Sequence, residues 1–266
     1  MFTTRRPSPG RLLSAAALAT ALLTAACGGG QSSAPGPAPA PAATPAPTAN
    51  PVDPATAATV TGRIVFKGTP PRREPISMES DPRCMPEGGS ATTEQAVVGR
   101  NGELQNVFVY VKDGLGNLRF PVPSTPVVFE QKGCTYRPHV FGVQVGQPIE
   151  ILNSDATLHN IHAMPEANQE FNAGQAVQGA KHVHVFSAVE VMVPFKCDVH
   201  RWMRAYVGVL DHPFFAVTGA DGAFTLAGLP PGTYTIEARH ETFGTRTLSV
   251  TVGARESKDV AFTFEG

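Results

Sequence analysis

The feature that most constrains this chain is the lack of a sustained helical pattern. Beyond the first 58 residues, no stretch longer than about ten residues keeps a 3.6-residue apolar period without Gly or Pro. From residue 60 onward, short apolar or alternating runs such as 60–66 and 107–111 end at turn residues such as Asp113-Gly114. Such runs are typical of strands with one buried face. The body is therefore predicted to be all-β and built of β-sandwiches.

Further strands are expected along the rest of the body, because the same pattern of short apolar runs between turns continues to its end. They lie at 142–145, 149–153, 182–186, 189–195, 205–210, 218–226, 229–238, 247–252 and 258–264.

The first 26 residues have the composition of a signal peptide. Arg5, Arg6 and Arg11 precede a run of small and apolar residues, 12–26, which is too short and too Ala-rich for a membrane span. The Arg5-Arg6 pair raises a twin-arginine export route, but the prolines that follow fit that motif poorly and favour ordinary secretion.

Cys27 follows Leu22-Leu23-Thr24-Ala25-Ala26, which resembles the bacterial lipoprotein processing site. The resemblance implies a lipid on Cys27, and plain signal cleavage is the alternative. The Pro- and Ala-rich segment 27–58 cannot bury enough apolar surface to fold, so it is predicted to be a tether. The expected location is the cell envelope, in the periplasm or at the cell surface, with the lipid as membrane anchor. In a Gram-negative cell this would be the outer membrane.

Removing residues 1–26 leaves 18 Lys and Arg against 22 Asp and Glu, a formal net charge of −4. A mildly acidic chain argues against nucleic acid as a partner, because nucleic-acid binding needs a basic face.

The carboxy-terminal part resembles the carboxypeptidase regulatory-like domain, a transthyretin-like β-sandwich. The resemblance rests on the run Asp221-Gly222-Ala223-Phe224 and the turn Leu229-Pro230-Pro231-Gly232-Thr233-Tyr234. The remaining strands of such a domain lie far upstream, at 62–66 and 107–111. We expect 59–121 and 212–266 to form one sandwich, with a second domain, 122–211, inserted between them. A tandem arrangement is the alternative.

The most specific chemical pattern is Cys197, His200 and Met203, spaced three residues apart after the apolar run 189–195. A thiolate, an imidazole and a thioether are three of the four ligands of a type 1 copper site, which needs a second imidazole from elsewhere. Zinc is disfavoured, because structural zinc sites gather more cysteines and do not use Met.

The region from about 126 to 211 resembles the cupredoxins, and the run His159-Asn160-Ile161-His162 is similar to the amicyanin type of blue copper protein. The resemblance implies a Greek-key β-sandwich with one type 1 copper. Its implied ligands are His159, Cys197 and His200 in the equatorial plane and Met203 on the axis.

The same resemblance implies roles around the metal. Asn160 would hydrogen-bond to the cysteine loop, and the exposed edge of His200 would pass the electron. Trp202 would pack over the site or present an aromatic face to a partner. His139 and His162 are surplus to the ligand set, and the pair His182 and His184 reads as ordinary strand positions or an auxiliary surface site.

The cysteine count fits this assignment. If Cys27 carries a lipid and Cys197 holds metal, Cys84 and Cys134 remain, and in an oxidising compartment they are predicted to form a disulfide. Two free thiols are the alternative.

These observations predict a membrane-tethered copper protein that carries single electrons and is not an enzyme. Its expected partner is a redox protein, such as a c-type cytochrome or a periplasmic dehydrogenase. One alternative is a copper-binding or delivery protein without fast electron transfer. Another is a surface-anchored module that binds glycan or protein through the regulatory-like sandwich.

Overall fold

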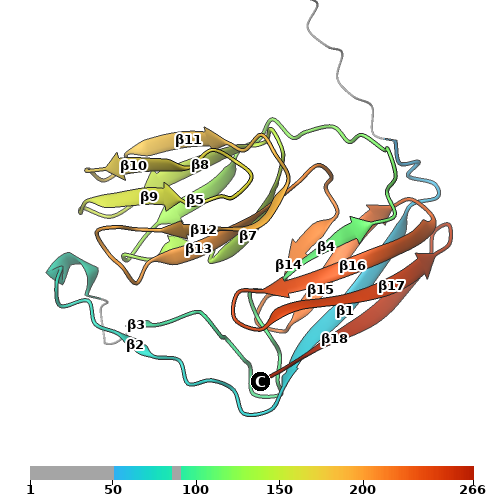
Figure 1. Ribbon diagram of the computed structural model, residues 1–266, viewed down its shortest axis with the longest axis horizontal. Helices are drawn as coiled ribbons and strands as arrows, with labels where there is room; N and C mark the ends of the chain where they lie inside the picture. The colour runs from blue at the N-terminus through green and yellow to red at the C-terminus, as the bar shows by residue number, and fades with distance from the viewer. Residues whose placement is uncertain (1–50, 86–90) are drawn as a thin grey trace, which may run out of the picture. The chain divides into compact units, whose positions relative to one another are not determined.

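The structure, a computed structural model, describes residues 51–85 and 91–266 (Figure 1). These residues form strands and a single short 3-10 turn, so the predicted all-β class is confirmed. Within the described ranges no helix is long and apolar enough to cross a membrane. The predicted signal peptide, Cys27 and most of the tether lie outside the described residues.

Two sheets made from both ends of the described chain form one sandwich, called here the terminal sandwich. One sheet has the order β15-β1-β18, with β1 antiparallel to β15 and parallel to β18. The other has the order β14-β4-β16-β17 and is antiparallel throughout. Its strands are β1 (Ala58–Lys67), β4 (Phe108–Asp113), β14 (Phe215–Val217), β15 (Ala223–Leu229), β16 (Gly232–His240), β17 (Gly244–Val252) and β18 (Ser257–Glu265).

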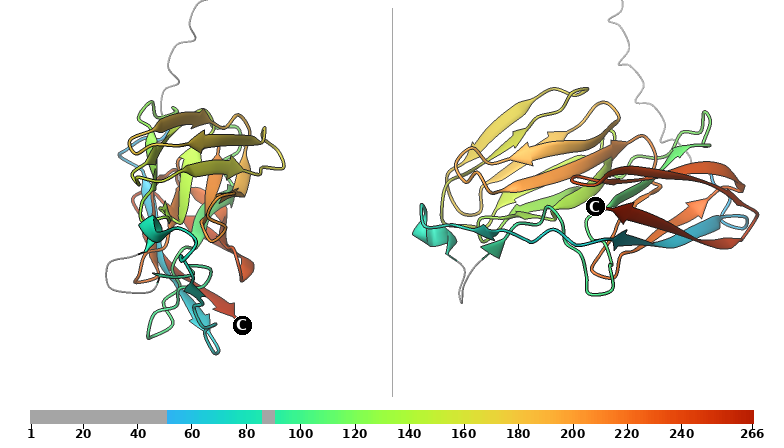
Figure 2. Two further views of the ribbon diagram at one scale, coloured as in Figure 1. Left: turned by 90° about the vertical axis from the view of Figure 1, so that its left-hand side faces the viewer. Right: turned by 60° about the horizontal axis from the view of Figure 1, so that its bottom comes forward.

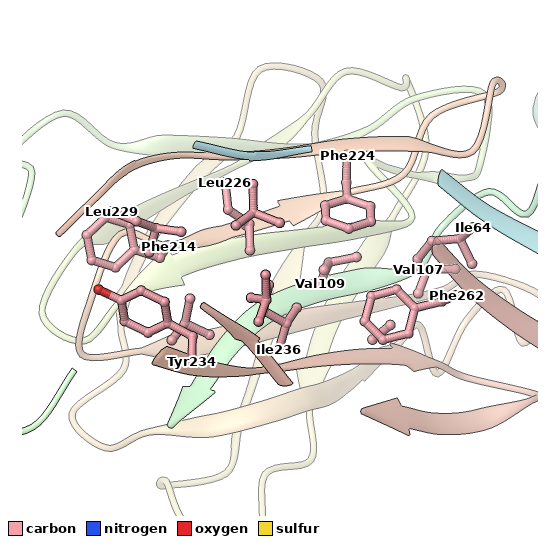
Figure 3. Packing of buried hydrophobic residues seen from close by; sticks show 14 of the residues in the cluster. Ile64, Val107, Val109, Phe214, Phe224, Leu226, Leu229, Tyr234, Ile236 and Phe262 are labelled. Carbon is pink, nitrogen blue, oxygen red and sulfur yellow. The ribbon is translucent and has the colours of Figure 1, made fainter. Parts of the chain in front are cut away.

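The core of the terminal sandwich follows from strand alternation. In β1 the side chains of Val60, Ile64 and Phe66 are buried while intervening residues are partly or fully exposed. Figure 3 shows how Ile64 and Phe224 from one sheet face Val109 and Ile236 from the other. Because alternate residues of a strand point to opposite faces, one apolar set from each sheet fills the space between them.

A second sandwich, the central sandwich, contains the predicted copper loop. Its sheets have the orders β10-β9-β12-β13-β7 and β11-β8-β5-β6, with parallel pairs β13–β7 and β5–β8. The strands are β5 (Val127–Gln131), β6 (Tyr136–Arg137), β7 (Val140–Gln144), β8 (Pro148–Asn153), β9 (His159–Ala163), β10 (Phe171–Gln175), β11 (Lys181–Val185), β12 (Glu190–Lys196) and β13 (Arg204–Leu210). Buried aromatic and aliphatic side chains, among them Phe129, Phe195 and Ile161, fill its core.

The central sandwich lies in the chain between β4 and β14, two neighbouring strands of one sheet of the terminal sandwich. From residue 108 to 111, β4 is buried on both faces, because Val109 and Val111 belong to the terminal core and Phe108 and Tyr110 face the other way. Phe108 and Tyr110 share a smaller apolar cluster with Val140, Met192 and Leu210 of the central sandwich. The two sandwiches are thus in direct apolar contact.

The predicted boundary at residue 121 placed the whole segment between β1 and β4 in the terminal sandwich. Part of this segment instead packs on the central sandwich. It holds β2 (Pro75–Ile76), the 3-10 turn η1 (Pro82–Cys84) and β3 (Ala91–Thr92) (Figure 1, Figure 2). Met78 and Cys84 are buried in the core of the central sandwich, and Ile76 packs against it. We call residues 75–85 the strap. Its buried apolar residues pack against the central sandwich. Their spacing in the sequence does not indicate this contact.

Candidate metal centre

The loop from Cys197 to Met203 connects β12 to β13, which are antiparallel neighbours. The last register pair, Lys196 with Arg204, places Cys197 opposite Met203, and the Cys197 amide donates to the Met203 carbonyl at 3.3 Å. Inside the loop, the Met203 amide donates to the His200 carbonyl at 2.9 Å, and the His200 amide lies 3.3 Å from the Cys197 sulfur. A short loop closed by these bonds fixes the relative positions of its three candidate ligands, all of which are buried.

His159, the first residue of β9, brings the second imidazole to this loop and is fully buried. Its Nδ1 lies 2.9 Å from Nδ1 of His200, and the Cys197 sulfur lies 3.9 Å from the same His200 nitrogen. One ligand atom from each of these three residues falls within 4.8 Å of the others. The structure therefore brings together the predicted equatorial set, while its binding of copper stays a prediction.

The expectation that His200 exposes its ring edge is wrong. His200 is only 1% exposed. Its Nε2, the nitrogen that would face solvent, lies 3.3 Å from the Asp81 carboxylate and 3.5 Å from the Cys84 sulfur, both in the strap. The strap, which the sequence analysis had placed in the terminal sandwich, covers the His200 ring.

Both histidines turn their outer nitrogen to a carboxylate. Nε2 of His159 lies 2.9 Å from Asp155, as Nε2 of His200 lies 3.3 Å from Asp81. An ionised carboxylate only accepts hydrogen bonds, so each Nε2 donates a proton to its carboxylate and each Nδ1 is the nitrogen that faces the site. Carboxylates behind ligating imidazoles orient the ring for a metal. Two imidazole nitrogens and a sulfur facing one another are the donor set that copper prefers.

The charge states of Asp81 and His159 support this arrangement. Hydrogen bonds from Arg83 and then Thr157 hold the pKa of Asp81 well below its usual range, so Asp81 is ionised at neutral pH. Burial lowers the pKa of His159, with the hydrogen bond to Asp155 opposing the shift, so its ring is neutral and able to bind metal.

The turn at Cys134 connects the parts of the site. Cys84 and Cys134 are joined by a disulfide, which attaches the strap, and Cys197 is the free cysteine of the described residues. The amides of Gly133 and Cys134 donate to the two Asp155 oxygens at 2.8 Å each, which holds the carboxylate against His159. The Cys134 carbonyl accepts from the Trp202 indole at 2.9 Å.

Asn160 and Tyr136 hold β9 against the cysteine loop. The Asp198 amide donates to the Asn160 side-chain oxygen at 2.7 Å, the contact that the cupredoxin resemblance implied. The Tyr136 hydroxyl lies 2.5 Å from the Asn160 carbonyl and 2.9 Å from that of Lys196, and burial raises the pKa of Tyr136. No sequence pattern pointed to Tyr136, because a tyrosine on a short strand does not reveal which carbonyls its hydroxyl contacts.

Trp202 packs against the site. Its ring centroid lies 5.1 Å from that of His200 at an interplanar angle of 45°. The surplus histidines are outside the ligand set: His139 contacts Glu241, and His162 lies 2.6 Å from Glu170 and 2.9 Å from Asp198 in the cysteine loop. On β11, His184 stacks on Phe171 at a centroid distance of 3.8 Å.

Two imidazoles and a thiol thus converge within an all-β sandwich, one residue pair away from the buried Met203. Residues 204–265 match the family model of the carboxypeptidase regulatory-like domain. That match begins at the first residue of β13, inside the central sandwich, and extends through the last strands of the terminal one.

Similar solved structures include copper proteins. A copper-containing nitrite reductase from Thermus scotoductus is 17% identical, with a TM-score of 0.32, and the match covers 35% of this chain and 24% of the reductase. A purple cupredoxin from Nitrosopumilus maritimus is 22% identical, with a TM-score of 0.28, covering 31% of this chain and 98% of that one. A reduced amicyanin variant is 21% identical, with a TM-score of 0.29, over 33% of this chain and 85% of amicyanin.

The chain thus spans about a quarter of the length of the nitrite reductase. A search of curated proteins gave no match. The assignment of the site rests on the donor set of this chain.

Proposed function

We propose that this chain is a type 1 copper protein that carries single electrons in the cell envelope. The observation that carries the proposal is the convergence of imidazole nitrogens of His159 and His200 with the Cys197 sulfur, all three side chains being buried. Bound copper would supply a one-electron couple between Cu(I) and Cu(II). The protein would supply the fixed ligand positions, since the loop and both imidazoles are already held by hydrogen bonds.

Copper loading of the full-length protein tests this function. We expect an intense visible thiolate-to-copper band that is lost in Cys197→Ser and in His159→Ala. His182→Ala, on the exposed edge strand β11, is the matched control and should keep the band. Copper-loaded protein without such a band would overturn the proposal.

Copper delivery is the alternative that uses the same ligands. The buried ligands and the disulfide-linked strap favour an electron carrier, because delivery needs a site that opens to release metal. Reversible reduction without loss of copper to a chelator would support electron transfer. Rapid loss of Cu(I) to the chelator would support delivery. We propose a carrier rather than an enzyme, because the buried side chains that converge here, two imidazoles and a thiol, are the donors of an electron-transfer copper site.

We further propose that a lipid on Cys27 holds the protein at a membrane facing the periplasm or the cell surface, within reach of a c-type cytochrome or a periplasmic dehydrogenase. The support is the processing-site pattern and the Pro-rich segment after it. The variant Cys27→Ala should move the protein from the membrane fraction to the soluble fraction. Retention in the membrane fraction would contradict the anchor.

A further inference from the structure

The usual route for an electron into a buried copper site would be an exposed ligand edge, and the strap closes it here. Asp81 lies 3.3 Å from Nε2 of His200, the Thr157 hydroxyl donates to Asp81 at 2.7 Å, and Arg83 donates to the Ala156 carbonyl at 3.2 Å. The disulfide between Cys84 and Cys134 then attaches this segment covalently. A partner approaching from the strap side meets the exposed Arg83 guanidinium, which is paired with Asp81, and not the imidazole.

A second approach to the site stays open at Trp202. The indole is half-buried, its ring packs 5.1 Å from the His200 ring, and it lines a cavity of about 640 Å³ together with Met203. The candidate axial ligand and the ring beside His200 therefore border the same space. An aromatic ring in contact with a ligand shortens the gap that an electron must cross.

The cavity is lined by excess positive charge. Arg73, Arg137 and Arg204 line it and are exposed, against the single acidic lining residue Glu94. Among the residues that the structure describes, no carboxylate lies within 4.0 Å of any of these three guanidinium groups. Three such arginines in a chain that is acidic overall form a local field that attracts anionic groups.

We propose that a redox partner docks through an acidic surface at this arginine-lined cavity and exchanges electrons through Trp202 instead of the edge of His200. The inference rests on the proposed electron-carrier function. With copper bound, one electron would pass from the site to an oxidised partner, and no bond or proton would be transferred. Charge complementarity of this kind sets orientation and association rate more than affinity.

The field at the cavity can be measured without copper, because Trp202 is the one tryptophan in the sequence. We expect iodide to quench its fluorescence in the metal-free protein more strongly than caesium at low ionic strength. Arg204→Glu should weaken iodide quenching about threefold and strengthen caesium quenching. Arg119→Glu makes the same change of net charge at an exposed arginine outside the cavity lining and should leave both values near those of the wild type.

Equal quenching by iodide and caesium in the wild type would overturn the inference. Equal effects of the substitutions at Arg204 and Arg119 would do so as well.

The route is tested on the copper-loaded protein with two small oxidants, anionic hexacyanoferrate(III) and cationic tris(phenanthroline)cobalt(III). Arg204→Glu should slow the anionic oxidant about tenfold at low ionic strength and speed the cationic one. Trp202→Leu should slow both while the visible band remains. Unchanged rates in Trp202→Leu would refute the route. Absence of the visible band in the wild type would instead refute the proposed function and leave the quenching result intact.

Discussion

Two glycines face each other where the sandwiches meet, and they make the contact testable. Gly142 of β7 and Gly208 of β13 are register partners. A methyl group added at Gly208 would lie 2.1 Å from the tip of the Phe108 ring, and one added at Gly142 would lie 2.4 Å from Phe215. Because the two glycines have no side chains, the Phe108 and Phe215 rings can lie close to the backbone at these positions. Their ring centroids are 5.8 Å apart.

We predict that Gly208→Ala destabilises the protein by overpacking. Carbon atoms in contact sit about 3.5–4.0 Å apart, so the Phe108 ring would have to retreat by roughly 1.5 Å. Forcing an extra methyl into a packed site costs about 1–3 kcal/mol. Phe108 is fully buried, and Phe108→Ala alone should cost about 3–5 kcal/mol.

The two effects should not add, because the methyl at 208 would enter space that Phe108→Ala has emptied. The double variant should be more stable than the sum predicts by about 1–3 kcal/mol, measured by urea unfolding of the metal-free protein. Gly174→Ala is the matched control, since a methyl there meets nothing within 4 Å, and its cost should stay within about 0.5 kcal/mol. Additive costs for the substitutions at 208 and 108 would refute the packing argument.

Two further predictions concern a carboxylate and a buried histidine. Asp81→Asn should keep the visible copper band but raise the reduction potential by tens of millivolts, because the Asp81 anion next to His200 stabilises the more positive metal ion. An unchanged potential in voltammetry would show that Asp81 has no influence on the reduction potential. Burial lowers the pKa of His240 from 6.5 to about 4, so the unfolded chain binds the extra proton between these values and stability falls as pH drops through that window. His240→Gln should remove up to about 3 kcal/mol of this acid-side loss in urea unfolding at pH 7 and pH 4.5, and an unchanged pH dependence would count against the assignment.

The parts of the site that could be read from sequence are the ones close together in the chain. Cys197, His200 and Met203 share one loop, so their spacing alone carries the chemistry. His159 could be added because it stands in a run that resembles a known family. The local turn and strand patterns likewise predicted most of the strands, since alternation needs only neighbouring residues.

The carboxylates next to the two histidines could not be predicted from the sequence, because their roles depend on contacts between distant parts of the chain. Asp81 is 119 residues from His200, and its segment shows neither strand alternation nor a helical period. Asp155 stands four residues before His159, yet its role depends on the Gly133 and Cys134 amides that hold it in place. The exposed edge of His200 was an inference from resemblance, and the strap overturned it.

The strap also links the terminal and central sandwiches along the chain. The chain leaves β1, a strand of the terminal sandwich, at Lys67, passes through the strap at the metal centre and then returns to β4. β13 leads from Met203 back into β14 through only residues 211–214, so the terminal sandwich bounds the candidate site from both directions along the chain. Metal binding to the native state stabilises whatever must be folded for the ligands to converge. Here that includes the strap, whose Asp81 contacts His200 and which the disulfide attaches at Cys134, so metal binding should stabilise the strap together with the central sandwich.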